Sequence, residues 1–449
     1  MKTTFGGRYA VVGTGIITAG LVAGFAAPNK VVKKPKPNLI IIYTDDQGYN
    51  DLGCYGSETI KTPRLDKMAE EGVKFTSFYT QPVSGPSRGA LMTGRYPLRI
   101  GGGWTVNSEE VTIAEVLRDA GYATGCIGKW DMSQRKELEG SVPNDQGFDY
   151  YYGTLGANDR GVVQIHRNKE PQFSTEDMGS LTKLYTDEAL NFIKKNQDTT
   201  FFLYLAHTMP HVRIGVSPQF KGTSAGELYG DVIEELDWNI GRVFDLVKEL
   251  GLDENTYIFF ASDNGPWSSR EAFYRSTHDG QLATGNAKPL RSSKGSPYEG
   301  GFRVPCIFWG PGRVKAGLTQ TGMLSNLDVL PTFAKLAGAK IPGNVKLDGY
   351  NQLKFMTGET VESVRKIFYY HVKNELQAVR YNNWKLLLKD TKLNFPYVKD
   401  PEKATVELYN LDTDLSEKVN VVDKYPKVTK RMLKLALKGP NQPDPLANP

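Results

Sequence analysis

Residues 39–46 read LIIIYTDD, an apolar run that ends in a threonine and two aspartates. A continuous apolar run of this kind predicts a strand covered on both faces, as in a parallel sheet between two layers of helices. Ligands of such sheets bind beyond the carboxyl ends of the strands. The stretch therefore predicts an α/β fold and places Asp45 and Asp46 where a functional site is expected.

Helix and strand patterns alternate along the chain beyond this stretch. We expect further strands at residues 122–127, 201–206 and 257–261, and helices at 63–72, 112–120, 187–195 and 232–250. Thr62 is suited to cap the first of these helices, and Thr112 with Glu115 forms a capping box for the second. The alternation predicts a large, mostly parallel sheet flanked by helices.

The pattern changes in the last quarter of the chain. Short alternating runs are followed by one helix at about 426–437, which predicts a smaller α+β subdomain with an antiparallel sheet. We place this subdomain at residues 361–449 and the catalytic α/β domain at residues 38–360.

The N-terminal residues have the layout of an export signal. Lys2 and Arg8 precede an apolar run that ends in small residues, which is typical of a secretory signal peptide at residues 1–27. An uncleaved membrane anchor is the alternative interpretation. Residues 28–37 form a basic linker. We expect an exported protein, periplasmic or secreted, with no stable membrane span after signal cleavage.

Composition limits the possible partners. The chain of 449 residues is 39% hydrophobic and 23% charged, which excludes disordered and fibrous classes. A net charge of +5 favours an acidic ligand weakly and does not indicate nucleic acid. The three cysteines are widely spaced, so we expect neither a disulfide framework nor a zinc site.

Two strand ends carry oxygen ligands. Asp45 and Asp46 follow the first strand, and Asp263 and Asn264 follow the strand at 257–261. Adjacent carboxylates repel each other unless a cation neutralises them, and an all-oxygen set suits a hard divalent ion such as calcium. The alternative is that both stretches are turns, in which these residue types are also common.

Cationic groups follow other predicted strands. These candidates are Lys129, with Asp131 two residues later, His207 and His211, and Lys294. Cations beside a metal site indicate an anionic substrate between them. Residues 83–95, VSGPSRGALMTGR, add Ser84 and Arg88. Pro86 favours a helix start, so we expect the amides of residues 87–89 to face the group on Ser84.

Residues 84–95 resemble the signature of the formylglycine-dependent sulfatases, in the alkaline-phosphatase-like superfamily. That signature is Cys or Ser, any residue, Pro, a small residue, Arg and later Thr-Gly-Arg. The likeness covers nearly the whole mature chain, including GKW at 128–130 and SDNG at 262–265. It implies hydrolysis of sulfate esters on a carbohydrate, with exo action on a polysaccharide or its oligosaccharides, such as a carrageenan-type galactan or a glycosaminoglycan.

The resemblance also implies roles for single residues. One calcium ion would be bound by Asp45, Asp46, Asp263 and Asn264, and a maturation enzyme would oxidise Ser84 to formylglycine. Arg88 and Lys129 would hold the formylglycine hydroxyls, Lys294 would bind the sulfate, and His211 would face the leaving oxygen. One hydroxyl of the aldehyde hydrate would attack sulfur while His211 protonates the departing oxygen, and the second hydroxyl would then expel sulfate.

Two positions depart from the family pattern. Asp131 stands where the family usually has histidine, so either His207, His166 or His278 replaces that group, or His211 acts alone. We expect Asp131 to contact substrate or to orient Lys129. Ser84 stands where cysteine is commoner: it is either natural or a replacement of a native cysteine, and without conversion the site is inactive.

Substrate contacts are expected from two polar, aromatic segments beside the motifs. The candidates are Trp104, Trp267, Tyr274 and His278, with loop packing as the alternative. Two other functions compete with the sulfatase interpretation. One is a phosphate or phosphonate ester hydrolase of the same superfamily, and the other is a catalytically silent glycan-binding relative.

Overall fold

The computed structural model of the chain describes residues 7–13, 36–102, 104–133, 140–389 and 405–440. Residues 36–449 form a compact unit that is separate from residues 1–35. The predicted signal peptide and linker lie outside the described residues, apart from 7–13 and 36–37. Every helix within the described ranges is too short or too polar to span a bilayer.

A ten-stranded sheet forms the centre of the second unit. Its strands are β1 (Asn38–Thr44), β2 (Val73–Phe75), β4 (Ala123–Lys129), β5 (Tyr150–Thr154), β6 (Val163–Arg167), β7 (Glu170–Thr175), β8 (Phe201–Ala206), β9 (Thr256–Ser262), β11 (Cys306–Trp309) and β12 (Leu318–Gln320). Their order is β12-β2-β11-β9-β1-β8-β4-β5-β6-β7. The five strands from β9 to β5 are mutually parallel, whereas β6, β7 and β11 pair antiparallel with their neighbours.

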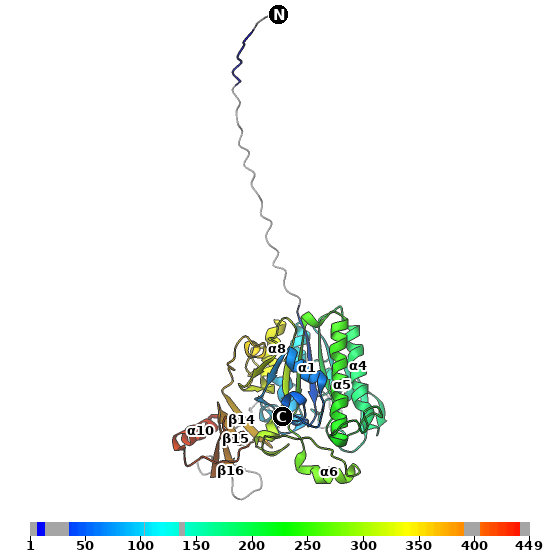
Figure 1. The fold of residues 1–449 in the computed structure, drawn as a ribbon, viewed down its shortest axis with the longest axis vertical. Coiled ribbons are helices and arrows are strands. Elements are labelled where there is room, and N and C mark those ends of the chain that lie inside the picture. Colours follow the sequence, from blue (N-terminus) through cyan, green and yellow to red (C-terminus); the bar gives the residue numbers. More distant parts are fainter. Residues whose placement is uncertain (1–6, 14–35, 103, 134–139, 390–404, 441–449) are drawn as a thin grey trace, which may run out of the picture. The chain divides into compact units, whose positions relative to one another are not determined.

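Helices cover both faces of this sheet (Figure 1). One face packs against α1 (Pro63–Glu71), α4 (Leu181–Lys195) and α5 (Glu227–Glu249), and the other against α2 (Ser84–Thr93), α3 (Ile113–Asp119) and α8 (Val329–Ala337). Side chains of β1 alternate between the two layers, with Ile40 and Ile42 on the first face and Leu39 and Ile41 on the second. All four are fully buried, each worth about 1.5–3 kcal/mol of hydrophobic stabilisation.

The prediction of a mostly parallel α/β sheet is confirmed. The capping box of α3 is present, because the Glu115 amide donates to the Thr112 hydroxyl and the Glu115 carboxylate accepts from the Thr112 amide. Thr62 is the N-cap residue of α1, as predicted, but its hydroxyl makes no capping hydrogen bond. Its hydroxyl instead donates to Asp66 and accepts the amide of Gly53, so it joins α1 to the preceding loop.

The C-terminal region contains a separate four-stranded antiparallel sheet, as predicted. It consists of β14 (Ile367–Val372), β15 (Glu375–Tyr381), β16 (Trp384–Lys389) and β17 (Thr405–Asn410), in that order. The final helix, α10 (Pro426–Lys438), packs Met432 and Ala436 on this sheet. A further sheet has three strands, β3 (Phe78–Tyr79), β10 (Arg303–Val304) and β13 (Leu324–Ser325), with β3 in the middle. Tyr79 of β3 belongs to the same hydrophobic cluster as Phe368 and Tyr370 of β14.

Candidate active site

The carboxyl ends of four parallel strands supply the candidate site. Asp45 and Asp46 follow β1, Asp263 and Asn264 follow β9, Lys129 is the last residue of β4, and β8 leads into the loop that carries His211. Register explains their proximity: Thr44 pairs with Ser262, and Tyr43 pairs with Ala206, so these strands end at the same level. The polar side chains that follow therefore meet at one edge of the sheet.

Ser84 is the first residue of α2 and is buried at this edge. Its Oγ lies 2.9 Å from Asp45 Oδ1 and 3.2 Å from Asn264 Oδ1. The expectation that the amides of residues 87–89 face this side chain is wrong for Ser87. The helix starts two residues before Pro86, and the Ser87 amide already donates to the Val83 carbonyl, 3.1 Å away.

Arg88 is held by one carboxylate. Its Nε and Nη2 donate to Asp263 Oδ2 at 3.1 and 2.8 Å, and its Nη1 donates to the Lys129 carbonyl and to the Tyr204 hydroxyl. The guanidinium is fully buried and lies over the Tyr43 ring, 5.7 Å from its centroid. Arg88 of α2 thus fixes the orientation of Asp263.

Lys129 lies between two carboxylates. Its Nζ is 2.5 Å from Asp45 Oδ2 and 3.2 Å from Asp131 Oδ2, with all three side chains essentially excluded from solvent. Burial alone lowers the pKa of Lys129, but the charges of Asp131 and Asp45 outweigh it and raise the pKa above its ordinary value. The lysine therefore stays protonated, and Asp131 directs it toward Asp45.

Asp46 connects the remaining charged groups. Its Oδ1 accepts from Asn264 Nδ2 at 2.6 Å and from Lys294 Nζ, and its Oδ2 lies 3.7 Å from His211 Nε2. Asp46 has a φ of 66°, in the left-handed region that aspartate enters more readily than most residues. Asp46 contacts Lys294, whereas Asp45 contacts Lys129, so the two carboxylates pair with different cations.

The pKa values of the carboxylates in the cluster are shifted in opposite directions. Burial raises the pKa of Asp46 to about 7, and the neighbouring charges of Asp45 and Asp263 add to this effect. Burial also raises the pKa of Asp263, with Asp45 the next contributor. Asp45 differs because Lys129, His211 and Arg88 together outweigh the effect of burial and hold its pKa far below the ordinary range.

A divalent cation fits this donor set. Asp46 Oδ2 is buried without a hydrogen-bond partner among the described residues, and oxygen atoms of Asp45 and Asp46 lie within 4.8 Å of a His211 nitrogen. Four carboxylates, of Asp45, Asp46, Asp131 and Asp263, face three cations, of Arg88, Lys129 and Lys294. The excess negative charge would repel an anionic substrate, and a divalent cation would reverse its sign.

His211 is oriented by three contacts that sequence reasoning missed. Its Nδ1 lies 2.6 Å from the Val212 carbonyl, which can only accept, so Nδ1 carries the proton and Nε2 faces the cluster. Asn158 Nδ2 donates to the His211 carbonyl at 2.6 Å, and Asp159 Oδ1 lies 3.6 Å from His211 Nε2. Burial lowers the pKa of His211 well below its ordinary value.

Asp159 could have been found by the rule that located the other residues. It lies in the loop after β5, whose sequence Tyr150–Thr154 is an aromatic run that ends level with Lys129 of β4. Because the run is short and contains a glycine, it was not recognised as a strand. The residues beyond its carboxyl end were therefore not considered.

Aromatic side chains border the cluster on one side. Trp267 lies 5.8 Å from the His211 ring and 5.5 Å from the Tyr274 ring, measured between centroids. Lys294 Nζ lies 4.9 Å from the centroid of Trp267. Both aromatic residues are partly exposed. They thus present ring faces next to the charged groups, an arrangement suited to contact with a sugar ring.

The other predicted histidines are not joined to the cluster by any hydrogen bond or ion pair within the described part of the chain. His207 is buried beside Tyr185 of α4, with ring centroids 6.5 Å apart, and burial lowers its pKa to about 3. His278 lies at the end of α6 (Glu271–Thr277), where its Nδ1 contacts the Tyr274 carbonyl. His166 lies on β6, paired with Gly153.

Trp104 is the least buried of the predicted substrate contacts. It is 44% exposed, and its neighbours connect it to the Asp131 segment: Thr105 forms a bridge with Ser133, and the Val106 amide donates to the Met132 carbonyl. This residue therefore lies near the segment that carries Asp131.

The loop that carries Lys294 is held by the C-terminal subdomain. Arg291 Nη1 donates to the Glu417 carbonyl at 2.8 Å, and the Glu299 amide donates to Glu417 Oε2 at 2.8 Å. Lys385 of β16 lies 3.0 Å from Glu299 Oε1 and 2.8 Å from Glu417 Oε1, and all three side chains are buried. The small subdomain thus contributes to the position of Lys294.

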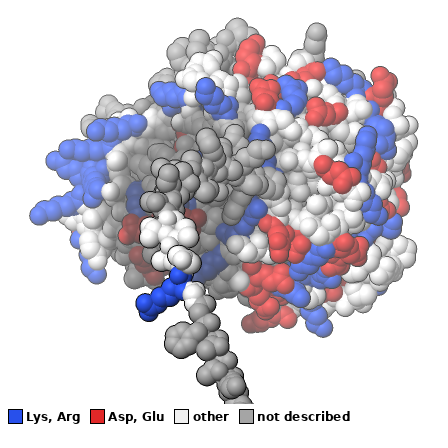
Figure 2. Space-filling model, turned by 90° about the horizontal axis from the view of Figure 1, so that it is seen from above, with Lys and Arg blue, Asp and Glu red and all other residues white. Residues whose placement is uncertain are grey.

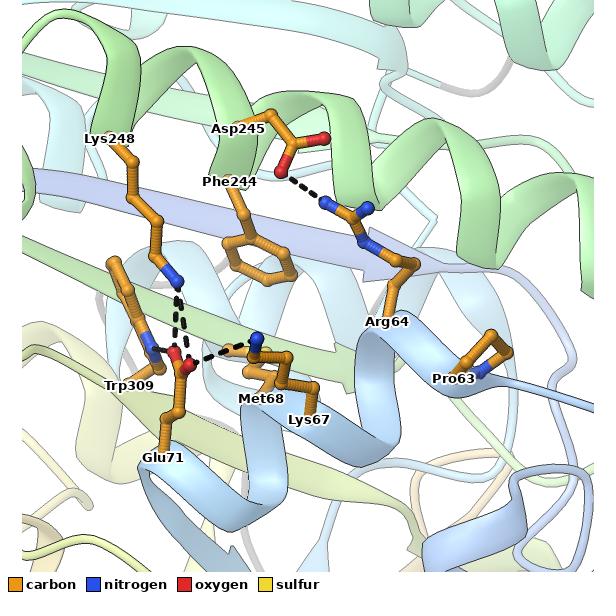
Figure 3. Close-up of a pocket in the computed structure, with 9 residues that line it drawn as sticks. All are labelled: Pro63, Arg64, Lys67, Met68, Glu71, Phe244, Asp245, Lys248 and Trp309. Atoms are coloured by element: carbon orange, nitrogen blue, oxygen red, sulfur yellow. Dashed lines mark hydrogen bonds and ion pairs between the residues drawn. The ribbon is translucent and has the colours of Figure 1, made fainter.

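A second pocket lies between α1, α5 and β11, with a volume of about 300 Å³ (Figure 3). Its charged groups are paired with each other, Lys248 and Lys67 with Glu71 and Arg64 with Asp245, and Trp309 Nε1 donates to Glu71. These pairs leave no cluster of groups suited to catalysis in this pocket. The edge of the sheet around Ser84 is therefore the candidate active site.

Two family models match the chain. The model described as Sulfatase matches residues 37–339, and the model described as N-sulphoglucosamine sulphohydrolase, C-terminal, matches residues 293–439. The N-acetylgalactosamine-6-sulfatase of Rattus norvegicus is 35% identical over 386 residues, which are 78% of this chain and 71% of the relative. The arylsulfatase G of Mus musculus is 33% identical, over 79% of this chain and 76% of the relative.

Solved structures resemble the chain over most of its length. A Bacteroides thetaiotaomicron protein from work on the metabolism of multiple glycosaminoglycans has a TM-score of 0.77 and 27% identity, covering 90% of this chain and 99% of its own. Ps i-CgsB, solved in complex with k-i-k-neocarrahexaose, has a TM-score of 0.75 and 32% identity, covering 90% and 92%. The phosphonate monoester hydrolase SpPMH from Silicibacter pomeroyi, at 17% identity and a TM-score of 0.64, shares the fold.

Proposed function

Since the chain belongs to the sulfatase family and is a sulfuric ester hydrolase that acts on sulfated carbohydrates, we propose that it removes sulfate from chain ends of a polysaccharide or its oligosaccharides at the cluster around Ser84. The observation that carries this proposal is the buried contact of Ser84 Oγ with Asp45 and Asn264, surrounded by Arg88, Lys129 and Lys294.

Ser84 is the proposed precursor of the reacting group. A formylglycine made from Ser84 would, when hydrated, supply one hydroxyl for attack on sulfur and a second one to release the sulfate. Asp45 Oδ1 accepts from Ser84 Oγ, and its low pKa keeps it an acceptor at all working pH values. Asp45 is therefore placed to orient a hydroxyl at this position by accepting its hydrogen bond.

Asp45, Asp46, Asp263 and Asn264 are the proposed ligands of one calcium ion. The ion would supply positive charge next to the sulfate oxygens. Lys294 and Lys129, which contact Asp46 and Asp45, would add two further positive charges. Preorganised charge of this kind stabilises the transferring group without reorganisation of solvent.

His211 is the proposed proton donor to the leaving oxygen. Its Nδ1 proton is committed to the Val212 carbonyl, so Nε2 is the nitrogen that exchanges a proton with substrate. Asp46 Oδ2 and Asp159 Oδ1 lie 3.7 and 3.6 Å from Nε2. Burial and the charges of Lys294 and Lys129 lower the pKa of the ring, whereas the charge of Asp45 raises it. The departing sugar oxygen would occupy the space between His211 and Lys294.

The sugar is proposed to rest on Trp267 and Tyr274. Relatives and structural neighbours support a carbohydrate: one carries N-acetylgalactosamine-6-sulfatase as its name, and another was solved with a carrageenan-type oligosaccharide. A sulfated galactan or a glycosaminoglycan matches this set. The apolar run near the N-terminus supports export, which would bring the enzyme to such polymers.

The alternative function is hydrolysis of a phosphate or phosphonate ester. The phosphonate monoester hydrolase SpPMH has the same fold as this chain. Phosphate ester hydrolases of the superfamily that bind two zinc ions need several histidines around the nucleophile. In the described ranges the cluster able to hold a metal contains one histidine, His211, beside Asp45 and Asp46. This composition supports the sulfatase proposal over the alternative.

The test is turnover of matched esters. The chain is produced together with a serine-type formylglycine-generating enzyme, and galactose 6-sulfate, N-acetylgalactosamine 6-sulfate and their 6-phosphate counterparts are compared. We expect release of sulfate and little release of phosphate. Phosphate release by protein with unmodified serine would contradict the proposal, and Ser84→Ala provides the background rate.

A further inference from the structure

Helix α10 carries its cations on one face. These residues are Lys427, Lys430, Arg431, Lys434 and Lys438, all exposed. With 3.6 residues per turn, they fall within an arc of about 100° around the helix axis. Met432 and Ala436, which pack on the C-terminal sheet, lie on the opposite side. The cationic face therefore points away from the protein.

The charge of the whole chain is concentrated on this helix. The formal net charge is +5, and residues 426–438 contain five cationic and no acidic residues, so the rest of the chain is neutral in sum. Figure 2 shows Lys and Arg side chains projecting together at the left edge of the molecule, where Figure 1 places α10. Such local concentration produces a positive potential that a balanced surface lacks.

This arrangement is unfavourable for the helix itself. Like charges three or four residues apart repel, as Lys427 with Arg431 and Lys430 with Lys434 do. Lys427 also lies in the first turn, where the helix dipole disfavours a cation. No carboxylate among the described residues forms an ion pair with any of the five side chains, although Arg431 lies over the Tyr381 ring at 4.4 Å. The charges thus weaken the isolated helix.

We propose that this face of α10 binds a sulfated polysaccharide chain at a distance from the reacting sulfate. The inference rests on the proposed function, because the partner is a further stretch of the same polyanionic substrate. Lys427 and Lys438 are about 16 Å apart along the helix axis, a span suited to an extended anionic chain rather than to one sulfate group.

Two further observations favour this partner. In Figure 1 the C-terminal sheet with α10 lies at the same end of the molecule as α6, the helix that follows β9 and the Asp263 segment. A polymer that binds α10 and the active site at the same time is held more tightly than by either contact alone. A membrane surface fits less well, since the apolar side of α10 is already packed on the C-terminal sheet.

The test uses charge reversal on the intact enzyme. In the variant K427E/K430E/K434E the new glutamates at 427 and 434 stand four residues before Arg431 and Lys438, an orientation that stabilises a helix, so the fold is retained. The control K194E/K221E/K340E makes the same change of net charge at exposed, scattered lysines. Affinity electrophoresis in carrageenan gels measures Kd, and sulfate release from the polymer and from galactose 6-sulfate measures kinetics.

We expect the α10 variant to bind carrageenan about tenfold more weakly, because each surface charge pair contributes a factor of a few. KM for the polymer rises similarly, while kinetics with galactose 6-sulfate stay the same. Equal loss in the control variant, unchanged polymer binding, or tighter binding of the wild type to duplex DNA or phosphatidylserine vesicles would overturn the inference. Absence of sulfate release from every substrate would instead refute the proposed function, since gel binding does not require turnover.

Discussion

Asp131 positions Lys129 through a buried ion pair. It stands where the family usually has histidine, and its carboxylate lies 3.2 Å from Lys129 Nζ in a buried pair. With a φ of 56°, it also holds a left-handed turn after β4 that aspartate and asparagine tolerate better than most residues. The geometry favours orientation of Lys129 over direct proton transfer to substrate.

Asp131→Asn is expected to lower kcat about tenfold or more, because Lys129 loses one of two carboxylates that hold it beside Asp45. Asparagine keeps the left-handed turn, so the loss measures charge rather than backbone strain. Steady-state kinetics with a sulfated monosaccharide check the prediction. An unchanged kcat would show that Asp45 alone positions Lys129.

Asp159→Asn is expected to lower kcat/KM about tenfold for a sugar sulfate and far less for nitrophenyl sulfate. The reason is that Asp159 lies 3.6 Å from His211 Nε2 and supports protonation of the leaving oxygen, which a phenolate leaving group does not need. The matched control is His278→Gln, because His278 contacts the Tyr274 carbonyl rather than the cluster. Equal losses with both substrates would contradict a role through His211.

His207 was misplaced by a sequence interpretation that ignored strand periodicity. Side chains alternate along β8: Tyr204 and Ala206 face the layer of α2, and Leu203 and Leu205 face the layer of α4. His207 continues this alternation and lies beside Tyr185 of α4. Its position at a strand end was predicted correctly, but the period of two assigns it to the face away from Arg88.

At the scale of elements, the sequence predicts those site residues that directly follow long apolar strands. The runs at 39–43 and 257–261 identified Asp45, Asp46, Asp263 and Asn264, because parallel strands end at one edge of the sheet. β5 was missed because its five residues lack an aliphatic run. The antiparallel pairing of β11 with β9 depends on contacts distant in sequence and has no local signal.

The connection between α7 (Glu299–Phe302) and the C-terminal sheet is expected to depend on Lys385. Lys385→Met removes the buried cation that Glu299 and Glu417 share and leaves Glu299 paired with Arg303, so we expect destabilisation of about 3–5 kcal/mol. Thermal or denaturant unfolding measures this change. Lys366→Met provides the control, because its pair with Glu362 is exposed, and it should change stability little. Similar stability of both variants would contradict a structural role for Lys385.

At the scale of the whole molecule, the excess negative charge of the cluster predicts dependence on a divalent cation. Dialysis against EDTA should abolish sulfate release and lower Tm, and calcium at 100 times its Kd should restore about 2.7 kcal/mol of stability. Asp46→Asn should remove most of the calcium-dependent shift in Tm. Equal Tm values with calcium and with EDTA for the unmutated chain would contradict a calcium site.

The sequence predicted the fold class correctly, including the antiparallel C-terminal sheet, because alternation of apolar runs is a local signal that sums over the chain. It did not identify the cationic face of α10. The basic residues at 427–438 are separated by two or three other residues, so they form no run, and helical geometry alone brings them together. The contacts that anchor the Lys294 loop to Glu417 join distant segments and required the structure.

The most direct test of the account is the chemical state of residue 84 in active protein. Peptide mass spectrometry across residues 84–95 gives the fraction of Ser84 that has lost two hydrogens, and sulfate release is measured on the same preparations. We predict that activity rises in proportion to this fraction and is absent when serine is unmodified. Sulfate release by a preparation in which residue 84 is entirely serine would contradict the account.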